Sequence, residues 1–209
     1  MTASGDFQSA RDDLAYLRGL VDGTGPIRAT IGECFLWAGA LYGGQCFLHW
    51  LQVQGLAPET GWGAAAIVWL PTLLFCGVLT LIIWKERKTK TTGAASRALG
   101  AVFQGAGLAN LVMAFVFGYG SQQAENFGLW LYHPIVVCMF QGVAWYVAWA
   151  ILRRTWLAFV ALGWFVTTVA LGVAVFGDIG DYLLILSFAL ILFMAVPGWV
   201  IWRGAKKAA

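Results

Sequence analysis

Six stretches of almost uninterrupted hydrophobic residues run along the chain, separated by short polar connections. They fall at about residues 31–53, 62–84, 98–119, 129–151, 156–177 and 182–202. Each is long enough to cross a hydrocarbon core about 30 Å thick, which takes roughly 20 helical residues. None alternates between apolar and polar positions as a barrel strand does, and a helix satisfies its own backbone hydrogen bonds in lipid. The pattern predicts an all-α, polytopic integral membrane protein built as a bundle of six transmembrane helices whose consecutive members are antiparallel neighbours.

Apolar residues also recur every three or four positions ahead of the first stretch, at Phe7, Ala10, Leu14, Leu17 and Val21. This spacing predicts an amphipathic helix that lies on the inner membrane surface or against the bundle, or docks a cytoplasmic partner. The polar N-terminus has no basic segment leading into a short apolar core, so we expect no cleavable signal peptide. The expected organisation is a cytoplasmic N-terminal segment (1–28), a transmembrane domain (29–204) and a cytoplasmic tail (205–209).

The charges orient this predicted bundle. Only 11% of the residues are charged and 60% are hydrophobic, whereas about 25% of a soluble domain is charged. All 13 lysines and arginines precede the first stretch, follow the sixth, or lie in the second and fourth connections. The positive-inside rule therefore places both termini in the cytoplasm, and the compact loops favour a bacterial inner membrane. Basic residues at the ends of apolar segments indicate membrane orientation and the lipid bilayer as a partner, and not nucleic-acid binding.

The four cysteines are Cys34, Cys46, Cys76 and Cys138. All lie within apolar segments and no two form a C-x-x-C motif, so they do not indicate a disulfide framework. A free cysteine packs as a small hydrophobic residue. Their distribution also argues against a membrane thiol oxidoreductase.

Three ionisable residues, Glu33, His49 and His133, fall inside the predicted spans, where such groups are costly and often functional. Glu33 lies near the cytoplasmic edge, within reach of lipid headgroups or of a cytoplasmic arginine such as Arg28, and we expect a local ion pair. His49 and His133 lie at matching depth near the outer edge. They could ligate haem or a transition metal, with Cys46 on the same helix face as His49. Alternatively, both histidines belong to the aromatic belt at the membrane interface.

Uncharged polar residues occupy the deeper parts of the spans: Asn110, Gln141, Thr167, Thr168 and Ser187. Such groups form hydrogen bonds between membrane helices. Gln141 and Trp145 are one turn apart on one face, so Asn110, Gln141 and Trp145 could instead bind a small or lipidic ligand in an apolar pocket. The first span also carries Gly39 and Gly43, the spacing that lets helix backbones approach closely.

Motifs for known chemistry are missing from the sequence. It contains no Walker A sequence, no H-E-x-x-H and no G-x-S-x-G, and no lysine lies within a predicted span. The sequence therefore favours a non-enzymatic membrane protein that binds a protein partner, forms a homo-oligomer, or has a structural or regulatory role. Two alternatives stay open: a small transporter or channel for a neutral or lipophilic solute, and a haem- or metal-binding protein that uses His49 and His133.

Overall fold

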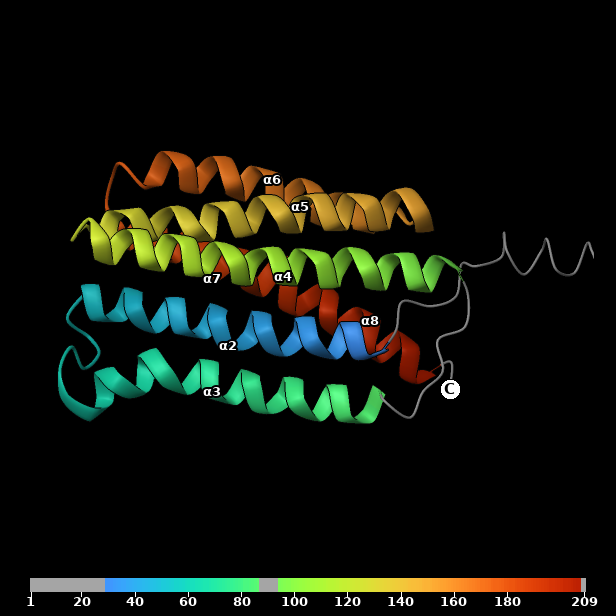
Figure 1. Ribbon diagram of the computed structural model, residues 1–209, viewed down its shortest axis with the longest axis horizontal. Helices are drawn as coiled ribbons and strands as arrows, with labels where there is room; N and C mark the ends of the chain where they lie inside the picture. Colours follow the sequence, from blue (N-terminus) through green and yellow to red (C-terminus); the bar gives the residue numbers. More distant parts are fainter. Residues whose placement is uncertain (1–28, 87–93, 208–209) are drawn as a thin grey trace, which may run out of the picture.

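Every regular element in the described part of the chain is helical. The computed structural model describes residues 29–86 and 94–207, shown in Figure 1. The elements are α2 (Ala29–Val53), α3 (Gly61–Glu86), α4 (Ala94–Gln123), η1 (Phe127–Leu131), α5 (Tyr132–Leu152), α6 (Thr155–Ala174), α7 (Ile179–Leu190), η2 (Ile191–Ala195) and α8 (Val196–Lys207). The predicted amphipathic helix lies in residues 1–28, outside the described residues.

Five helices in the described chain are long and apolar enough to cross a membrane, which indicates a multi-pass membrane protein. They cover Gly61–Lys85, Ser96–Gln123, Phe127–Leu152, Thr155–Ala174 and Ile179–Lys206. The last is one continuous helix in which α7 and α8 are joined by η2, a turn of π-helix. The first predicted span is also a helix, α2, but it is not among the five. Its composition explains why, since it contains a carboxylate, an imidazole, two glutamines and four glycines.

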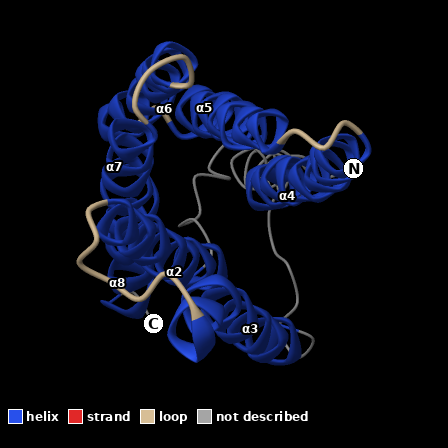
Figure 2. Ribbon diagram, turned by 90° about the vertical axis from the view of Figure 1, so that its left-hand side faces the viewer, coloured by secondary structure: helices blue, strands red, loops and turns tan. Residues whose placement is uncertain are grey.

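The helices form an incomplete ring around the long axis. Viewed along the helices, the order around this ring is α4, α5, α6, the last helix (α7, η2 and α8), α2 and α3, as Figure 2 shows. Within this order, α3 packs chiefly against α2, and α4 packs against α5 and η1. Consecutive helices are therefore neighbours as expected, except that α3 and α4 flank the open side. Instead, α2 packs against the last helix, which closes the other side.

Glycines set the close approach of α2 to the last helix. A Cβ built on Gly39 would lie 2.7 Å from the Leu190 carbonyl oxygen, and one on Gly43 would lie 2.8 Å from Ile191 Cγ1. The prediction that these two glycines serve close packing is confirmed. The same interface uses Gly32 and Gly198, because a Cβ on either one would lie 2.8 Å from the carbonyl oxygen of the other.

Single hydrogen bonds from side chains to backbone carbonyls tie neighbouring helices together. Ser187 Oγ donates to the Gly43 carbonyl across the α2–α7 interface, at 2.9 Å, which confirms the predicted interhelical role of Ser187. Thr167 and Thr168 instead donate to carbonyls one turn earlier in their own helix, so the predicted interhelical role is wrong for both. Both hydroxyls find a hydrogen-bond acceptor in their own helix, as threonine hydroxyls commonly do.

Two further bonds of this kind join other pairs of helices. Gln45 Nε2 donates to the Val68 carbonyl of α3 at 3.0 Å, and Tyr182 Oη donates to the Leu131 carbonyl of η1 at 2.6 Å. Val68 lies in the turn before Pro71, and a proline inside a helix distorts the backbone around it. An amide from α2 therefore reaches an exposed part of the α3 backbone.

Described basic and acidic residues separate toward the two ends of the bundle, except that Glu33 and Glu86 lie at the basic end. Glu33 is the one with a described ion pair. It pairs with Lys85 at 3.5 Å, between the start of α2 and the end of α3. An ion pair of Glu33 therefore exists among the described residues, with a lysine as the partner; the predicted partner Arg28 lies outside the described residues. The sequence could not show this, because the pairing depends on α2 and α3 lying side by side.

Candidate functional site

Gln141 and Trp145 form the most unusual feature of the interior. They lie one turn apart on the buried face of α5 and are 5% and 0% exposed. Gln141 Oε1 and Trp145 Nε1 are buried and have no hydrogen-bond partner among the described residues. Leaving one such group unpaired costs about 1–3 kcal/mol. Two complementary unpaired groups on one face therefore need an explanation.

Asn110 of α4 carries a third atom of this kind. Its Oδ1 is buried without a partner in the described part of the chain, while its backbone carbonyl lies 3.4 Å from His133 Nε2 on α5. Because a carbonyl oxygen accepts, the ring nitrogen of His133 is the donor. The side chains predicted as a ligand site, Asn110, Gln141 and Trp145, thus all lie along the adjacent helices α4 and α5, and each has one unpaired polar atom.

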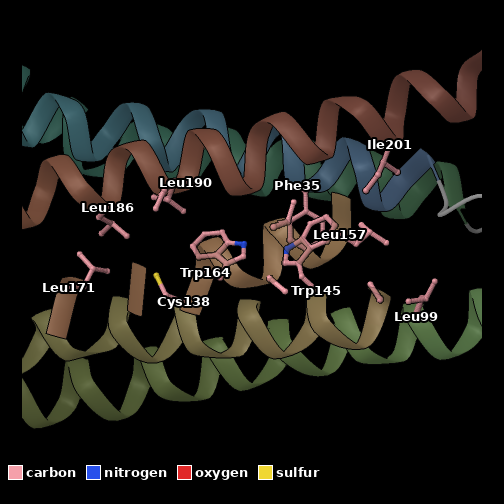
Figure 3. Packing of buried hydrophobic residues seen from close by; sticks show 14 of the residues in the cluster. Phe35, Leu99, Cys138, Trp145, Leu157, Trp164, Leu171, Leu186, Leu190 and Ile201 are labelled. Carbon is pink, nitrogen blue, oxygen red and sulfur yellow. The ribbon is translucent and has the colours of Figure 1, made fainter. Parts of the chain in front are cut away.

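Aromatic rings surround Trp145. Phe35 of α2 lies 5.2 Å and Phe103 of α4 lies 5.3 Å from it between ring centroids, and these two phenylalanines contact each other at 5.0 Å. Trp156 of α6 adds a fourth ring at 6.3 Å. None of these rings offers the indole N–H a conventional acceptor. Figure 3 shows Trp145 with Phe35 and Leu157 beside it in the core.

Small residues on α5 bring α6 against this face. Ala144 and Ala148 are buried, and a Cβ on Gly142 would lie 2.7 Å from the Phe165 ring. The aromatic ring of Phe165, a residue of α6, therefore occupies the space that a side chain at position 142 would need. This packing fixes the rotation of α5, so that Gln141 and Trp145 face the interior.

Trp164 on α6 provides a comparison for Trp145. It is equally buried, at 0% exposed, but its Nε1 donates to the Phe193 carbonyl at 3.1 Å. Phe193 belongs to η2, where the wider π-helical turn changes the usual backbone pairing. Sequence reasoning did not predict this bond, because no local signal marks the π-helical turn.

The predicted metal ligands have other contacts. His49 Nδ1 lies 2.7 Å from Gln52 Oε1, and the His133 ring stacks on Trp130 at 4.9 Å. Cys46 packs against the core cluster that contains Cys138. Among the described residues, no group of three or more His, Cys, Asp or Glu side chains could hold a metal ion.

A bis-histidine haem site would need only two of these residues. One hydrogen bond at each ring leaves the other nitrogen as a ligand, an arrangement that is also usual around metal-binding histidines. The haem or metal site with His49, His133 and Cys46 therefore stays a prediction.

Comparison of the chain with protein families, curated proteins and solved structures finds no match. Function must therefore be argued from the residues themselves. The interior at Gln141 and Trp145 presents one hydrogen-bond acceptor and one donor that have no partner among the described residues.

Proposed function

We propose that this protein is a non-enzymatic, six-span module of the bacterial inner membrane, with both termini in the cytoplasm, that works by associating with a second copy of itself. The observation that carries this proposal is the exposed face of α4. It has an amide, Gln104, in the midst of apolar side chains.

The length and packing of α2 support its assignment as the sixth span. Its 25 residues extend about 37 Å at 1.5 Å per residue, enough to cross the hydrocarbon core. It packs against α3, α7, η2 and α8, so protein covers much of its surface. Its polar groups also have partners, including Lys85 for Glu33 and the Val68 carbonyl for Gln45. A span shielded in this way does not need the apolar composition of a lipid-facing helix.

Charge at the two ends supports the orientation. The described basic side chains lie where α3 ends, where α4 begins, at the α5–α6 connection and at the end of α8: Lys85, Arg97, Arg153, Arg154, Arg203 and Lys206. The opposite end carries Glu59, Glu125 and Asp178 in its connections and Asp181 in the first turn of α7. Basic residues near membrane helices favour the cytoplasmic side. Lys206 also lies over the Trp202 ring at 4.0 Å, as expected for an interfacial anchor.

The face of α4 that points away from α5 is the proposed association surface. Leu108, Leu111 and Phe115 on this face are 64%, 69% and 74% exposed, and Gln104 at the same face is also exposed. A Cβ at Gly100 or Gly107 would meet no described atom within 4 Å. Small residues around a polar side chain are typical of the interfaces between membrane helices.

A second copy fits this surface because a primary amide both donates and accepts hydrogen bonds. Two copies related by a two-fold axis along the membrane normal place Gln104 of each at the same depth. The two amides can then pair with each other, while the neighbouring glycines allow the backbones to approach. Lipid could cover the leucines and Phe115 but would leave the amide unpaired in hydrocarbon, at a cost.

The test is the mass of the purified full-length protein in mild detergent, with Gln104→Leu and a matched control, Gln122→Leu, near the end of the same helix. We expect a dimer for the wild type and for Gln122→Leu, and a monomer or a weakened dimer for Gln104→Leu. A wild-type protein that stays monomeric as its concentration in the micelles rises would overturn the proposal. A transporter or channel for a neutral solute stays a prediction, tested by solute flux in proteoliposomes.

A further inference from the structure

The unpaired atoms of Gln141 and Trp145 complement each other. Gln141 Oε1 can only accept a hydrogen bond and Trp145 Nε1–H can only donate one, and neither has a partner among the described residues. Residues four apart on a helix lie on the same face, with Cβ atoms about 5–6 Å apart. The core of α5 therefore presents one acceptor beside one donor, on side chains that are more than nine-tenths buried.

We propose that Gln141 and Trp145 hold a neutral hydroxyl group, a function separate from the association of copies through α4. The hydroxyl donates its hydrogen to Gln141 Oε1, and its oxygen accepts the indole N–H of Trp145. A carbonyl could accept from the indole but donate nothing, and an ammonium could donate but not accept. An ionised ligand would be costly at this depth, because Gln141 lies near the middle of the Phe127–Leu152 span.

Trp164 shows that this fold can satisfy a buried indole with its own backbone. Its N–H reaches the Phe193 carbonyl, and both rings appear in the same region of the core in Figure 3. Trp145 has the same burial, but the aromatic rings that contact it, Phe35, Phe103 and Trp156, offer its N–H no conventional acceptor. The difference between the two tryptophans is the reason to assign Trp145 to an external partner.

The residues around Gln141 and Trp145 indicate the chemical character of the rest of the ligand. Aromatic rings around Trp145 suit an apolar body. Since α4 is packed chiefly on α5 and η1, it is the helix whose displacement can admit a molecule to this face. The hydroxyl therefore belongs either to an apolar alcohol that enters from the bilayer or to water.

The experiment follows the indole N–H signals of the full-length protein in phospholipid nanodiscs, with ¹⁵N-labelled tryptophan. Trp145→Phe assigns the Trp145 signal among the signals of the 12 tryptophans. The probe is 1-dodecanol, with dodecane as the matched molecule that lacks the hydroxyl. Gln141→Leu removes the acceptor, and the Trp164 signal serves as the internal control because its donor is already satisfied.

For an alcohol, we expect saturable movement of the Trp145 signal with dodecanol and not with dodecane, and about 3- to 10-fold weaker binding in Gln141→Leu, for one lost hydrogen bond. For water, we expect that dodecanol does not move the Trp145 signal and that this signal receives magnetisation from a long-lived bound water. Gln141→Leu should abolish this transfer. Either result supports the hydroxyl site. The proposal is overturned if the wild-type signal shows neither response, or if dodecane moves it as much as dodecanol does. These wild-type readings remain decisive even if a variant fails to fold.

Discussion

Replacing Gly39 by alanine tests whether α2 is held against the last helix by backbone contact. The added Cβ would lie 2.7 Å from the Leu190 carbonyl oxygen and 2.8 Å from Ala195 Cα, and would also collide with Ala195 N. All three are backbone atoms, so no side chain can rotate away to make room. The substitution must therefore push α2 and the last helix apart along an interface that also contains Gly43.

The magnitude follows from two opposing effects. Overpacking a close-packed interior costs about 1–3 kcal/mol, and rigid backbone atoms on the opposing helix favour the upper part of that range. Alanine recovers about 1 kcal/mol relative to glycine through its higher helix propensity. We therefore expect Gly39→Ala to lower the free energy of unfolding by about 2 kcal/mol, which is roughly a 30-fold change in the unfolding equilibrium.

Gly44→Ala is the matched control on the same helix. A Cβ at Gly44 would meet no described atom within 4 Å, so only the gain in helix propensity remains, up to about 1 kcal/mol. Reversible unfolding in mixed micelles, monitored by tryptophan fluorescence and circular dichroism, gives both values. If Gly39→Ala is as stable as Gly44→Ala, the close approach of α2 to the last helix is wrong.

Three further substitutions probe other contacts with the same unfolding assay. Ser187→Ala removes the bond to the Gly43 carbonyl and should cost about 0.6 kcal/mol, the average for such bonds in membranes; an unchanged stability would show that the hydroxyl has no net role. Trp164→Phe leaves the Phe193 carbonyl without its donor and should cost about 1–3 kcal/mol, whereas a neutral result would contradict the bond across the π-helical turn. Glu33→Gln breaks a partly exposed ion pair and should cost less than about 1 kcal/mol, and a larger loss would mean that the pair is shielded from water.

Much of the fold could be predicted because the hydropathy pattern sets where helices begin and end. The six predicted stretches correspond to α2, α3, α4, η1 with α5, α6, and the α7–α8 helix, with ends that differ by a few residues. Charge and turn residues mark these ends locally. The π-helical turn at Ile191–Ala195 has no such mark, because it depends on packing against α6 and α2.

Partners across the bundle could not be predicted, because hydropathy does not fix the order of helices around a ring. The described partner of Glu33, Lys85, therefore comes from a different helix, α3. Likewise, Gly39 and Gly43 signalled close packing, but only the structure shows that they face the last helix and that Gly198 opposes Gly32.

The candidate site was predictable in its residues and not in its environment. The polar character of Asn110, Gln141 and Trp145 at depth was enough to single them out. That each has an unpaired buried atom depends on the neighbours supplied by other helices. For Trp145 these are aromatic rings, whereas the equally buried Trp164 meets a carbonyl.

The central claim is that α2 is a sixth membrane span, and the parity of the spans tests it directly. A short split-fluorescent-protein tag placed at the N-terminus or after Ala209 is assayed in cells for complementation by the large fragment expressed in the cytoplasm. Six spans place both ends on one side, so both tagged proteins should fluoresce. If only the C-terminal tag is complemented, the chain crosses the membrane an odd number of times, and α2 does not span it.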